Sequence, residues 1–301
     1  MRYSLGVDIG ASKISFALLK GKHCISKDKI STPKKQKDII EAISNIISRI
    51  TRHISSEQIK GIGVGVPGPI DKEKESVLNP PNLKALFKFP LKKVLQKKLS
   101  FEVKIENDAN CFVLGEAVIG AGKGFRKVIG LTLGSGVGGG IVFRTARNQW
   151  KIYTGAFGGA GEFGHMTIKF DGLKCSCGNF GCLEAYASAK FFERKSKYSP
   201  KEIENQARKG NKKAIALYKE FGKNLGIGIA NLVNVLDPEV VVIGGSISKA
   251  SQLFLKETKK EAKKRILSPY SKRFVKIKIA KLGDFSGAIG AALLPEIQNY
   301  D

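Results

Sequence analysis

The sequence predicts an α/β protein made of two similar halves. Apolar runs typical of strands alternate with segments whose apolar residues recur at helical spacing. A weak repeat supports the two halves, because LGVDIG at residues 5–10 aligns with IGLTLG at residues 129–134 and the order of elements repeats with it. With 301 residues and 42% hydrophobic content, the chain is long enough for one large or two ordinary domains, each with a core.

The first half, residues 1–118, is expected to follow the order βββαβαβα. Isoleucines at helical spacing predict its first helix, and Pro67-Gly68-Pro69 stops the strand that follows it. Asp108 is well placed as the N-cap of the last helix in this half. The expected strands are 3–9, 14–19, 23–30, 59–66 and 101–107, and the expected helices are 38–50, 91–99 and 108–121.

The second half, residues 119–285, starts the pattern again with two paired strands around a glycine turn. A long helix follows, and Pro238 introduces the next strand. The C-terminal segment 286–301 is expected to pack back on the first half as a helix. Two α/β halves that face each other would form a cleft, where ligands of such folds bind. The expected strands are 127–133, 139–143, 239–245 and 274–280, and the expected helices are 211–234, 251–267 and 288–298.

The chain is strongly basic, with 52 Lys and Arg against 26 Asp and Glu and a formal net charge of +26. Such a charge suggests nucleic acid first. However, acidic or apolar residues interrupt the basic clusters, which favours solvated helical faces over a dedicated binding surface. The composition excludes a disordered chain and a membrane span, and the N-terminus does not resemble a signal peptide, so we expect a cytoplasmic protein.

The five cysteines indicate a reduced compartment and a metal site. Cys24 and Cys111 stand alone, and an odd, clustered set fits a metal better than a disulfide framework. Together with one histidine, the cluster offers a tetrahedral ligand set for Zn²⁺, and four protein ligands leave no open position, so the zinc should be structural. The alternative is a group of ordinary buried thiols. The four candidate ligands are His165, Cys175, Cys177 and Cys182.

Two glycine turns are candidate phosphate-binding segments. In Asp8-Ile9-Gly10-Ala11-Ser12-Lys13, backbone N–H groups and Ser12 can approach a phosphate, and Asp8 can hold Mg²⁺ through water. A plain hairpin turn is the alternative. Gly134, Gly136 and Gly139 form a G-x-G-x-x-G match, but the dinucleotide interpretation requires a following helix, and the strand-like IVF follows here. A turn that binds phosphate, or a tight hairpin alone, remains.

Three acidic residues are candidates for work on a hydroxylated substrate. Asp108 follows a strand, where a carboxylate can take a proton from a substrate hydroxyl that Asn107 fixes. The alternative is that Asp108 only caps its helix. Glu162 and Glu184 flank the cysteine cluster, and carboxylates held in this way can accept hydrogen bonds from vicinal hydroxyls. A polyol such as a sugar would suit them.

Together these motifs resemble the ROK family of sugar kinases, within the actin/hexokinase/Hsp70 ATPase superfamily, over nearly the whole chain. DIGASK (8–13) and LTLGSGVGGGIV (131–142) are similar to its phosphate segments, ENDAN (106–110) to its catalytic segment and VVIGGS (241–246) to its adenosine-side segment. GVPGPI (65–70) and NPPNL (79–83) are similar to its sugar-contacting loops, and AGEFGH (160–165) with CSCGNFGCLEAYAS (175–188) to its sugar and zinc site. Ser135 stands where the family usually has Thr, and the Gly-Trp that often follows Pro-Asn-Leu is missing.

The resemblance implies two ribonuclease-H-like (actin-like ATPase) lobes with ATP and sugar in the cleft between them. Asp108 is implied as the general base on the sugar hydroxyl, most often O6, which attacks the γ-phosphate of Mg-ATP. His165 is implied to bind zinc with one ring nitrogen and a sugar hydroxyl with the other. The implied sugar-binding residues are Asn82, Asn107, Asp108, Glu162, His165 and Glu184. The implied ATP and phosphate residues are Asp8, Gly10, Ser12, Lys13, Thr132, Gly134, Ser135, Gly136, Gly244 and Gly245.

The resemblance leaves the preferred sugar open. NPPNL and CLEAYAS are similar to glucose kinases of the family, which we place first, whereas NDANCF and GEFGHM are equally similar to N-acetylglucosamine kinases; fructose and N-acetylmannosamine kinases share most motifs. ATP is the expected donor, with another nucleotide or polyphosphate as alternatives. ROK repressors carry a helix-turn-helix ahead of the first phosphate motif, which starts here at residue 4. We therefore expect a kinase over a regulator or sugar sensor, a homodimer or dimer of dimers, and neither membrane nor specific nucleic-acid binding.

Overall fold

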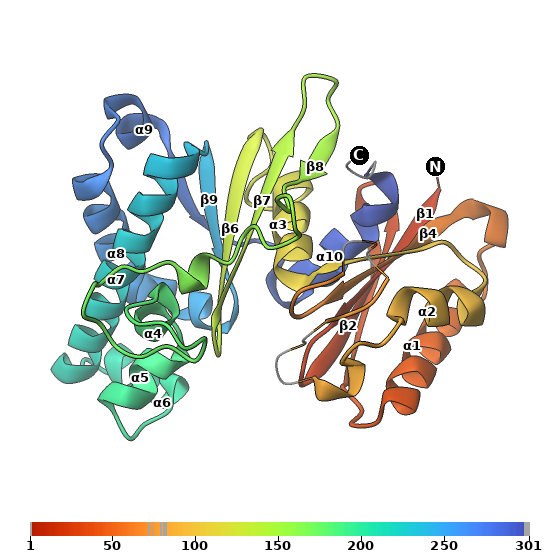
Figure 1. Cartoon of the computed structure of the whole chain (residues 1–301), viewed down its shortest axis with the longest axis horizontal. Helices are drawn as coiled ribbons and strands as arrows, with labels where there is room; N and C mark the ends of the chain where they lie inside the picture. The colour runs from red at the N-terminus through yellow and green to blue at the C-terminus, as the bar shows by residue number, and fades with distance from the viewer. Residues whose placement is uncertain (1, 72, 74, 79, 81–82, 298–301) are drawn as a thin grey trace. The chain divides into compact units, whose positions relative to one another are not determined.

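A computed structural model describes residues 2–71, 73, 75–78, 80 and 83–297 of the chain (Figure 1). The chain divides into two compact units. The first comprises Met1–Arg126, Ile141–Ala160 and Lys281–Asp301, and the second comprises Lys127–Gly140 and Gly161–Ala280. Residues 119–126 and 141–160 thus group with the first unit, whereas the sequence placed them in a second half that begins at residue 119.

The first unit is built on a five-stranded sheet in the order β3-β2-β1-β4-β5. β1 and β2 form an antiparallel hairpin, whereas β1, β4 and β5 run parallel, so their carboxyl ends meet at one edge. The strands are β1 (Tyr3–Ile9), β2 (Lys13–Lys20), β3 (His23–Ser31), β4 (Ile59–Val66) and β5 (Val103–Asn107), and the helices are α1 (Gln36–Thr51), α2 (Leu91–Leu99), α3 (Asp108–Val118) and α10 (Ser286–Leu293).

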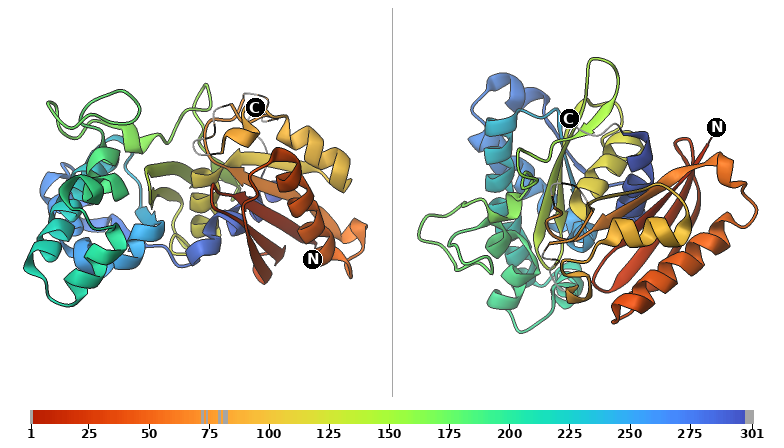
Figure 2. Two further views of the ribbon diagram at one scale, coloured as in Figure 1. Left: turned by 90° about the horizontal axis from the view of Figure 1, so that it is seen from below. Right: turned by 45° about the vertical axis from the view of Figure 1, so that its right-hand side comes forward.

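Helices cover both faces of this sheet. Figures 1 and 2 show α1 and α2 along one face, where the isoleucines of α1 join the core of the unit, and α3 and α10 along the other. α10 lies so close to the strands that a Cβ on Gly63 would come 1.7 Å from the Ala291 carbonyl oxygen. Glycine in β4 is therefore a packing requirement, because any side chain would push α10 off the sheet.

The second sheet has the strand order β10-β9-β6-β7-β8, with β10, β9 and β6 parallel. The division between the units crosses this sheet, because β8 and the end of β7 group with the first unit. The strands are β6 (Lys127–Leu133), β7 (Val137–Arg144), β8 (Trp150–Ile152), β9 (Val240–Gly244) and β10 (Lys276–Ile279), and the helices are α4 (Leu183–Ala187), α5 (Ala189–Lys195), α6 (Pro200–Arg208), α7 (Lys212–Leu236), α8 (Ser251–Arg265) and α9 (Pro269–Phe274).

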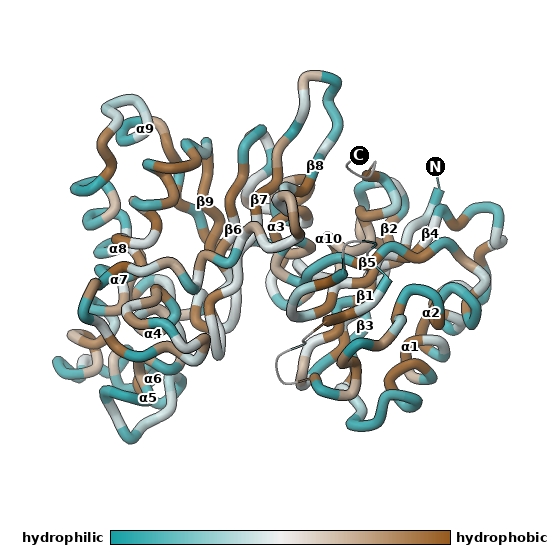
Figure 3. Tube along the Cα trace, viewed as in Figure 1, coloured by the Kyte–Doolittle hydropathy of each residue, from teal (hydrophilic) through white to brown (hydrophobic). Residues whose placement is uncertain are grey.

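Aromatic side chains dominate the helical core of the second unit. Phe192 stacks on Phe221 with ring centroids 5.2 Å apart, and Tyr218 stacks on Phe254 at 6.5 Å. Figure 3 shows β9 as a hydrophobic stretch, which agrees with the complete burial of Val240–Gly244. The lysines of α8 lie on its exposed side while Phe254 and Ala262 are buried, as the amphipathic pattern predicted. Short 3₁₀ turns complete the chain: Ser56–Gln58, Lys84–Leu86, Phe163–His165, Ser246–Ala250, Gly283–Phe285 and Leu294–Glu296.

The predicted α/β class and the order of elements in residues 1–118 are confirmed. Some element ends differ by two or three residues, as in β5, which begins at Val103, and α3, which ends at Val118. Two further details were wrong. Asp108 is the first residue of α3 and its N-cap is Asn107, whose side chain accepts from two backbone N–H groups. The last α-helix ends at Leu293, because Pro295 lacks the N–H that would continue it, and a 3₁₀ turn follows. Among the described residues, no helix has the length and apolarity needed to cross a membrane.

Candidate functional site

Two aspartates lie together at the carboxyl edge of the first sheet. Asp8 is at the end of β1, beside Gly65 of the parallel strand β4, and Asp108 opens α3 directly after β5. Burial, and then the negative charge of Asp108, raise the pKa of Asp8 from 3.8 to about 7. A buried carboxyl group whose pKa is raised this far by burial and a neighbouring charge is typical of a functional site.

Gly287 makes room for the Asp8 carboxylate, and Gly65 borders it. A Cβ on Gly287, in the first turn of α10, would lie 2.3 Å from Asp8 Oδ2. A Cβ on Gly65 would lie 3.5 Å from Asp8 Oδ1 and 3.3 Å from Cys111 Sγ. The carboxylate therefore occupies a narrow space that β4, α3 and α10 define together.

The raised pKa of Asp8 predicts a pH-dependent stability. Below pH 3.8 Asp8 is protonated in both the folded and the unfolded chain; as the pH rises towards 7 the unfolded chain loses this proton first, so stability falls across that window and stays lower above it. Asp8→Asn should remove this cost, raising the Tm at pH 8 by about 2–4 °C for each kcal/mol recovered. Differential scanning fluorimetry without nucleotide at pH 4 and pH 8 measures the effect.

The exposed Asp171 provides the control, because Asp171→Asn should leave the Tm unchanged at both pH values. An Asp8→Asn protein that is no more stable than the wild type at pH 8 would contradict the raised pKa.

Asn107 holds the start of α3. Its Oδ1 accepts from the N–H groups of Ala109 at 2.9 Å and Asn110 at 3.3 Å, and its Nδ2 donates to the Gly68 carbonyl at 3.2 Å. Because Asn107 supplies the cap, Asp108 has no need to. Sequence reasoning missed Glu106, a buried carboxylate that accepts from the Asn107 N–H at 2.9 Å and from Asn110 Nδ2 at 3.1 Å. The signal that could have identified Glu106 is its position as the first residue of ENDAN, the segment that resembles the catalytic segment of the family.

The first glycine segment forms the turn of the β1–β2 hairpin. The Gly10 N–H donates to the Lys13 carbonyl at 2.9 Å, and Thr32 Oγ1 donates to the Gly10 carbonyl at 2.7 Å. Ser12 is exposed in this turn, and the exposed Lys13 is the first residue of β2, next to the Ile9–Ile14 pair. The turn thus has the hairpin geometry that the sequence left open. Asn82, the remaining sugar-site candidate of this half, lies outside the described residues.

In the second unit, the predicted phosphate residues meet where β6 and β9 end. Thr132 pairs with Gly244 in parallel register, and the Gly134 N–H donates to the Gly136 carbonyl at 3.0 Å within the loop between β6 and β7. Gly245 has a φ of 84°, and a Cβ there would lie 2.3 Å from the Leu133 carbonyl oxygen. The strand β7 follows this loop, which confirms that it is no dinucleotide fingerprint. Carboxyl ends of parallel strands are where open α/β sheets bind ligands.

Glu184 connects this loop to the cysteine cluster. It is buried in α4, its Oε2 accepts from the Val137 N–H at 3.0 Å, and its Oε1 accepts from Ser176 Oγ at 3.0 Å and Lys190 Nζ at 2.7 Å. Burial alone would raise the pKa of Glu184, but the bonds from Lys190 and the Val137 N–H outweigh it and lower that pKa. Glu184 is therefore ionised at neutral pH.

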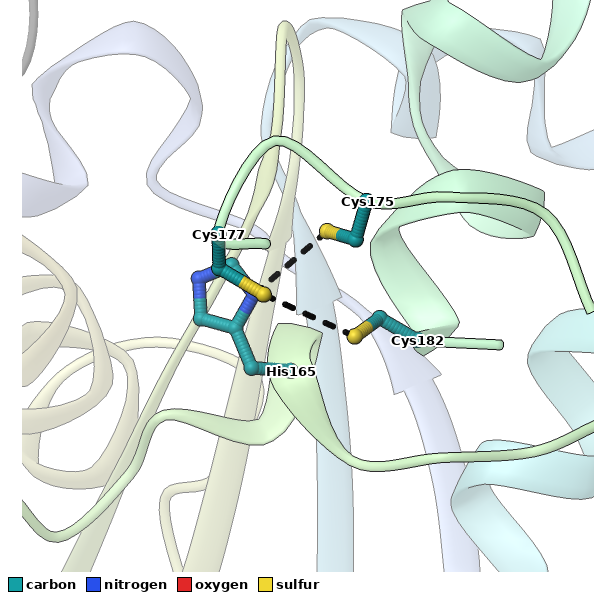
Figure 4. Close-up of side chains that lie close together, drawn as sticks. All are labelled: His165, Cys175, Cys177 and Cys182. Atoms are coloured by element: carbon teal, nitrogen blue, oxygen red, sulfur yellow. Dashed lines mark hydrogen bonds between the residues drawn. The ribbon is translucent and has the colours of Figure 1, made fainter. Parts of the chain in front are cut away.

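The cysteine cluster brings four possible metal ligands together (Figure 4). The ligand atoms of His165, Cys175, Cys177 and Cys182 all lie within 4.8 Å of one another. Cys177 Sγ is 3.7 Å from Cys182 Sγ, and Cys175 Sγ is 3.7 Å from His165 Nδ1. Zinc–sulfur bonds of about 2.3 Å at tetrahedral angles place sulfurs about 3.8 Å apart, so the residues fit this ion.

The thiols of the cluster lie in different environments. Burial raises the pKa of Cys182 to about 12, whereas the Asn179 N–H lowers the pKa of the exposed Cys177. Ionising a buried thiol costs free energy that a bound dication would offset.

Glu162 and His165 present polar groups beside the cluster. His165 turns Nδ1 towards Cys175 Sγ, and its Nε2 lies 4.0 Å from Glu162 Oε2. The Glu162 side chain is 63% exposed, so it can accept from a ligand. In the second unit, Glu162, His165 and Glu184 thus lie close to the cysteine cluster. Asp8, Asn107 and Asp108 belong to the first unit.

Nearly the whole chain matches the ROK family and several of its curated members. The sequence pattern of the ROK family matches residues 4–297. A glucokinase of Streptomyces coelicolor is 32% identical over 318 residues, which cover 97% of this chain and 97% of that protein. A xylose repressor of Bacillus subtilis is 33% identical over 300 residues, which cover 96% of this chain and 75% of the repressor.

The fold matches solved structures equally well. A crystal structure of a ROK family glucokinase from Streptomyces griseus, in complex with glucose and AMPPNP, has a TM-score of 0.81 and 31% sequence identity. The match covers 97% of this chain and 98% of that one. The predicted actin-like ATPase fold is confirmed by this match. By sequence and by fold, this chain belongs to the ROK family.

Proposed function

We propose that this protein is a sugar kinase that transfers the γ-phosphoryl group of Mg-ATP to a hexose hydroxyl. The observation that carries the proposal is the placement of the Asp108 carboxylate beside Asp8 at the carboxyl edge of the first sheet, within the segment that resembles the catalytic segment of the family. The similarity to a glucokinase and to a glucokinase structure with bound glucose and AMPPNP supports the same class of reaction.

In this mechanism Asp108 accepts the proton of the sugar hydroxyl as that oxygen attacks the γ-phosphate. Asn107 keeps Asp108 at the helix start by capping α3, which fixes the direction from which the carboxylate meets the hydroxyl. An aspartate is a weak base, but phosphoryl transfer has a loose transition state that depends mainly on positioning and charge neutralisation. Bound Mg²⁺ neutralises phosphate charge, and Asp8 would hold it through water.

The phosphates of ATP are assigned to the two glycine segments. Gly10, Ser12 and Lys13 line the hairpin turn of the first unit, and Thr132 to Gly136 with Gly244 and Gly245 lie at the ends of β6 and β9. Backbone N–H groups and hydroxyls of such turns suit phosphate oxygens. Ser135 keeps the hydroxyl that the family usually supplies from Thr.

Glucose is the first candidate for the sugar. The motifs NPPNL and CLEAYAS and the glucokinase relatives support it. Asn82, Asn107, Glu162 and His165 would bind its hydroxyls. Glu184, the remaining implied sugar residue, already accepts from Lys190, Ser176 and the Val137 N–H, so it would have to bind a hydroxyl in addition to these donors. N-acetylglucosamine, N-acetylmannosamine and fructose are the alternatives.

We further propose that the Cys₃His cluster binds one structural Zn²⁺. Removing the metal with a chelator should lower the Tm by at least about 5 °C, because a structural zinc contributes directly to folding. Cys182→Ser should lose the metal, whereas Cys24→Ser, outside the cluster, should retain it. Metal analysis together with thermal scanning measures both effects. A purified protein without metal, whose Tm a chelator leaves unchanged, would contradict the site.

An ADP-release assay over glucose, N-acetylglucosamine, N-acetylmannosamine, fructose and mannose tests the kinase proposal. We expect activity on glucose first.

The xylose repressor relative makes a regulator the second candidate. Absence of activity on all five sugars, together with tight sequence-specific DNA binding at physiological salt, would support the regulator and overturn the kinase. Because the lysines lie mostly on exposed helical faces, we expect only weak, salt-sensitive nucleic-acid binding.

A further inference from the structure

One short segment contacts both ends of the loop between β6 and β7. At the start of the loop, the Ala189 N–H donates to the Gly134 carbonyl at 2.8 Å. At its end, Glu184 accepts from the Val137 N–H, and a Cβ on Gly136 would lie 2.4 Å from Glu184 Oε2. The loop conformation therefore depends on where residues 184–189 place the Glu184 carboxylate.

The Glu184 carboxylate is in turn held by Lys190. Lys190 Nζ donates to Glu184 Oε1 at 2.7 Å and to Ser176 Oγ at 2.9 Å, and Ser176 donates to the same Glu184 oxygen. The Glu184 side chain is only 9% exposed and that of Lys190 is 34% exposed. A charge-assisted bond to a largely buried carboxylate contributes more than a surface ion pair, and removing the lysine would leave the buried charge poorly compensated.

The two oxygens of the Glu184 carboxylate have different partners, and this difference explains how Lys190 can act on the loop. Lys190 and Ser176 occupy Oε1, which leaves Oε2 directed at the Val137 N–H and the backbone of Gly136. Without Lys190, the carboxylate is expected to rotate towards solvent to regain hydration, and the loop would lose its hydrogen bond at Val137.

We propose that Lys190 is a positioning residue for nucleotide binding: by holding the Glu184 carboxylate against the Val137 N–H, it keeps the Gly134–Gly136 loop in its phosphate-binding conformation. The inference rests on the proposed function, in which this loop binds the phosphates of ATP. Lys190 acts through Glu184 and is not assigned a contact with the nucleotide.

Isothermal titration of Mg-ADP into the full-length protein tests the proposal. Lys190→Met keeps the aliphatic stem and removes the charge, and it should weaken the Kd about tenfold, which corresponds to the loss of about one charge-assisted hydrogen bond. Lys190→Arg should stay within about twofold of the wild type, because a guanidinium can donate to the same oxygens. Lys201→Met is the matched control, because Lys201 also pairs with a buried glutamate of this unit, Glu204, at 2.9 Å. The Kd of the Lys201→Met protein for Mg-ADP should equal that of the wild type.

A Glu184→Gln background separates positioning from direct contact. If Lys190 acts through Glu184, Lys190→Met should weaken Mg-ADP binding no further in that background. An equal loss in both backgrounds would mean that Lys190 contacts the phosphates itself, and an unchanged Kd for Lys190→Met would show that it has no role; either result overturns the proposal. Wild-type protein that binds no Mg-ADP would instead overturn the kinase assignment from which the inference starts.

Discussion

Asp108→Asn should lower kcat for sugar phosphorylation by about 10³-fold while sugar binding stays measurable, since removing a general base typically costs about 10² to 10⁴ in rate. The substitution is nearly isosteric, and the helix start is retained because Asn107 provides the cap. Asp108 Oδ1 accepts from the Ala109 N–H at 2.8 Å, a bond that the asparagine oxygen can also accept. What the variant loses is the capacity to take a proton.

The ADP-release assay measures the rate, and isothermal titration with glucose measures binding. Asp38→Asn, an exposed change in the first turn of α1, should keep the wild-type rate. If Asp108→Asn kept its rate, Asp108 would not be the base. If it lost both rate and fold, Asp108→Glu, which retains the negative charge, should recover part of the folded protein but little activity because the longer side chain displaces the base.

The second large effect is expected at Glu116, a completely buried carboxylate in α3. It accepts from the N–H groups of Ala121 at 2.7 Å and Leu282 at 2.8 Å, and from Ser286 Oγ at 2.9 Å. The Lys281 N–H also donates to it, at 3.0 Å. Glu116 therefore joins the end of α3 to the segment that leads into α10, 165 positions or more further along the chain.

Glu116→Gln should destabilise the protein by about 3 kcal/mol or more, because the new amide group faces N–H donors and leaves some of them without an acceptor in a dry interior. A loss of this size corresponds to a Tm lower by about 6–12 °C. Thermal and urea unfolding measure it.

Glu193→Gln, on the exposed side of α5, is the control and should change stability by less than about 0.5 kcal/mol. A Tm for Glu116→Gln within 2 °C of the wild type would contradict the importance of the carboxylate for stability.

The elements with the clearest local signals were predicted almost to the residue. The helix expected at 91–99 is Leu91–Leu99, and the strand expected at 127–133 is Lys127–Leu133. In both, the apolar spacing and the flanking residues are contained within the element, so nothing distant decides them. By contrast, β8 and the short helices α4, α5, α6 and α9 were not predicted. β8, α4, α5 and α9 have only three to seven residues and carry little periodicity of their own, and α6 buries only two apolar residues, Ile203 and Ala207.

The candidate site was predicted as a set of residues but not as an arrangement. The cluster of His165 and three cysteines followed from spacing alone, since its ligands lie within eighteen residues. The roles of Asn107 and Asp108 could not be separated from sequence, because both are good N-caps and only the backbone angles at residue 107 decide between them. Lys190 and Glu116 had no sequence signal.

By itself, the sequence determined the α/β class, the order of elements in residues 1–118, the two glycine turns and the grouping of His165 with three cysteines, because each depends on residue types at short, regular spacing. Only the tertiary structure decided which carboxylates have a shifted pKa and which are fixed by hydrogen bonds from distant residues. The pKa of Asp8 rises because β4, α3 and α10 enclose it, and Glu184 and Glu116 are fixed by donors 47 and 170 positions away. Burial and charge act through space, so their effects on a residue become visible only when the neighbours that folding brings to it are known.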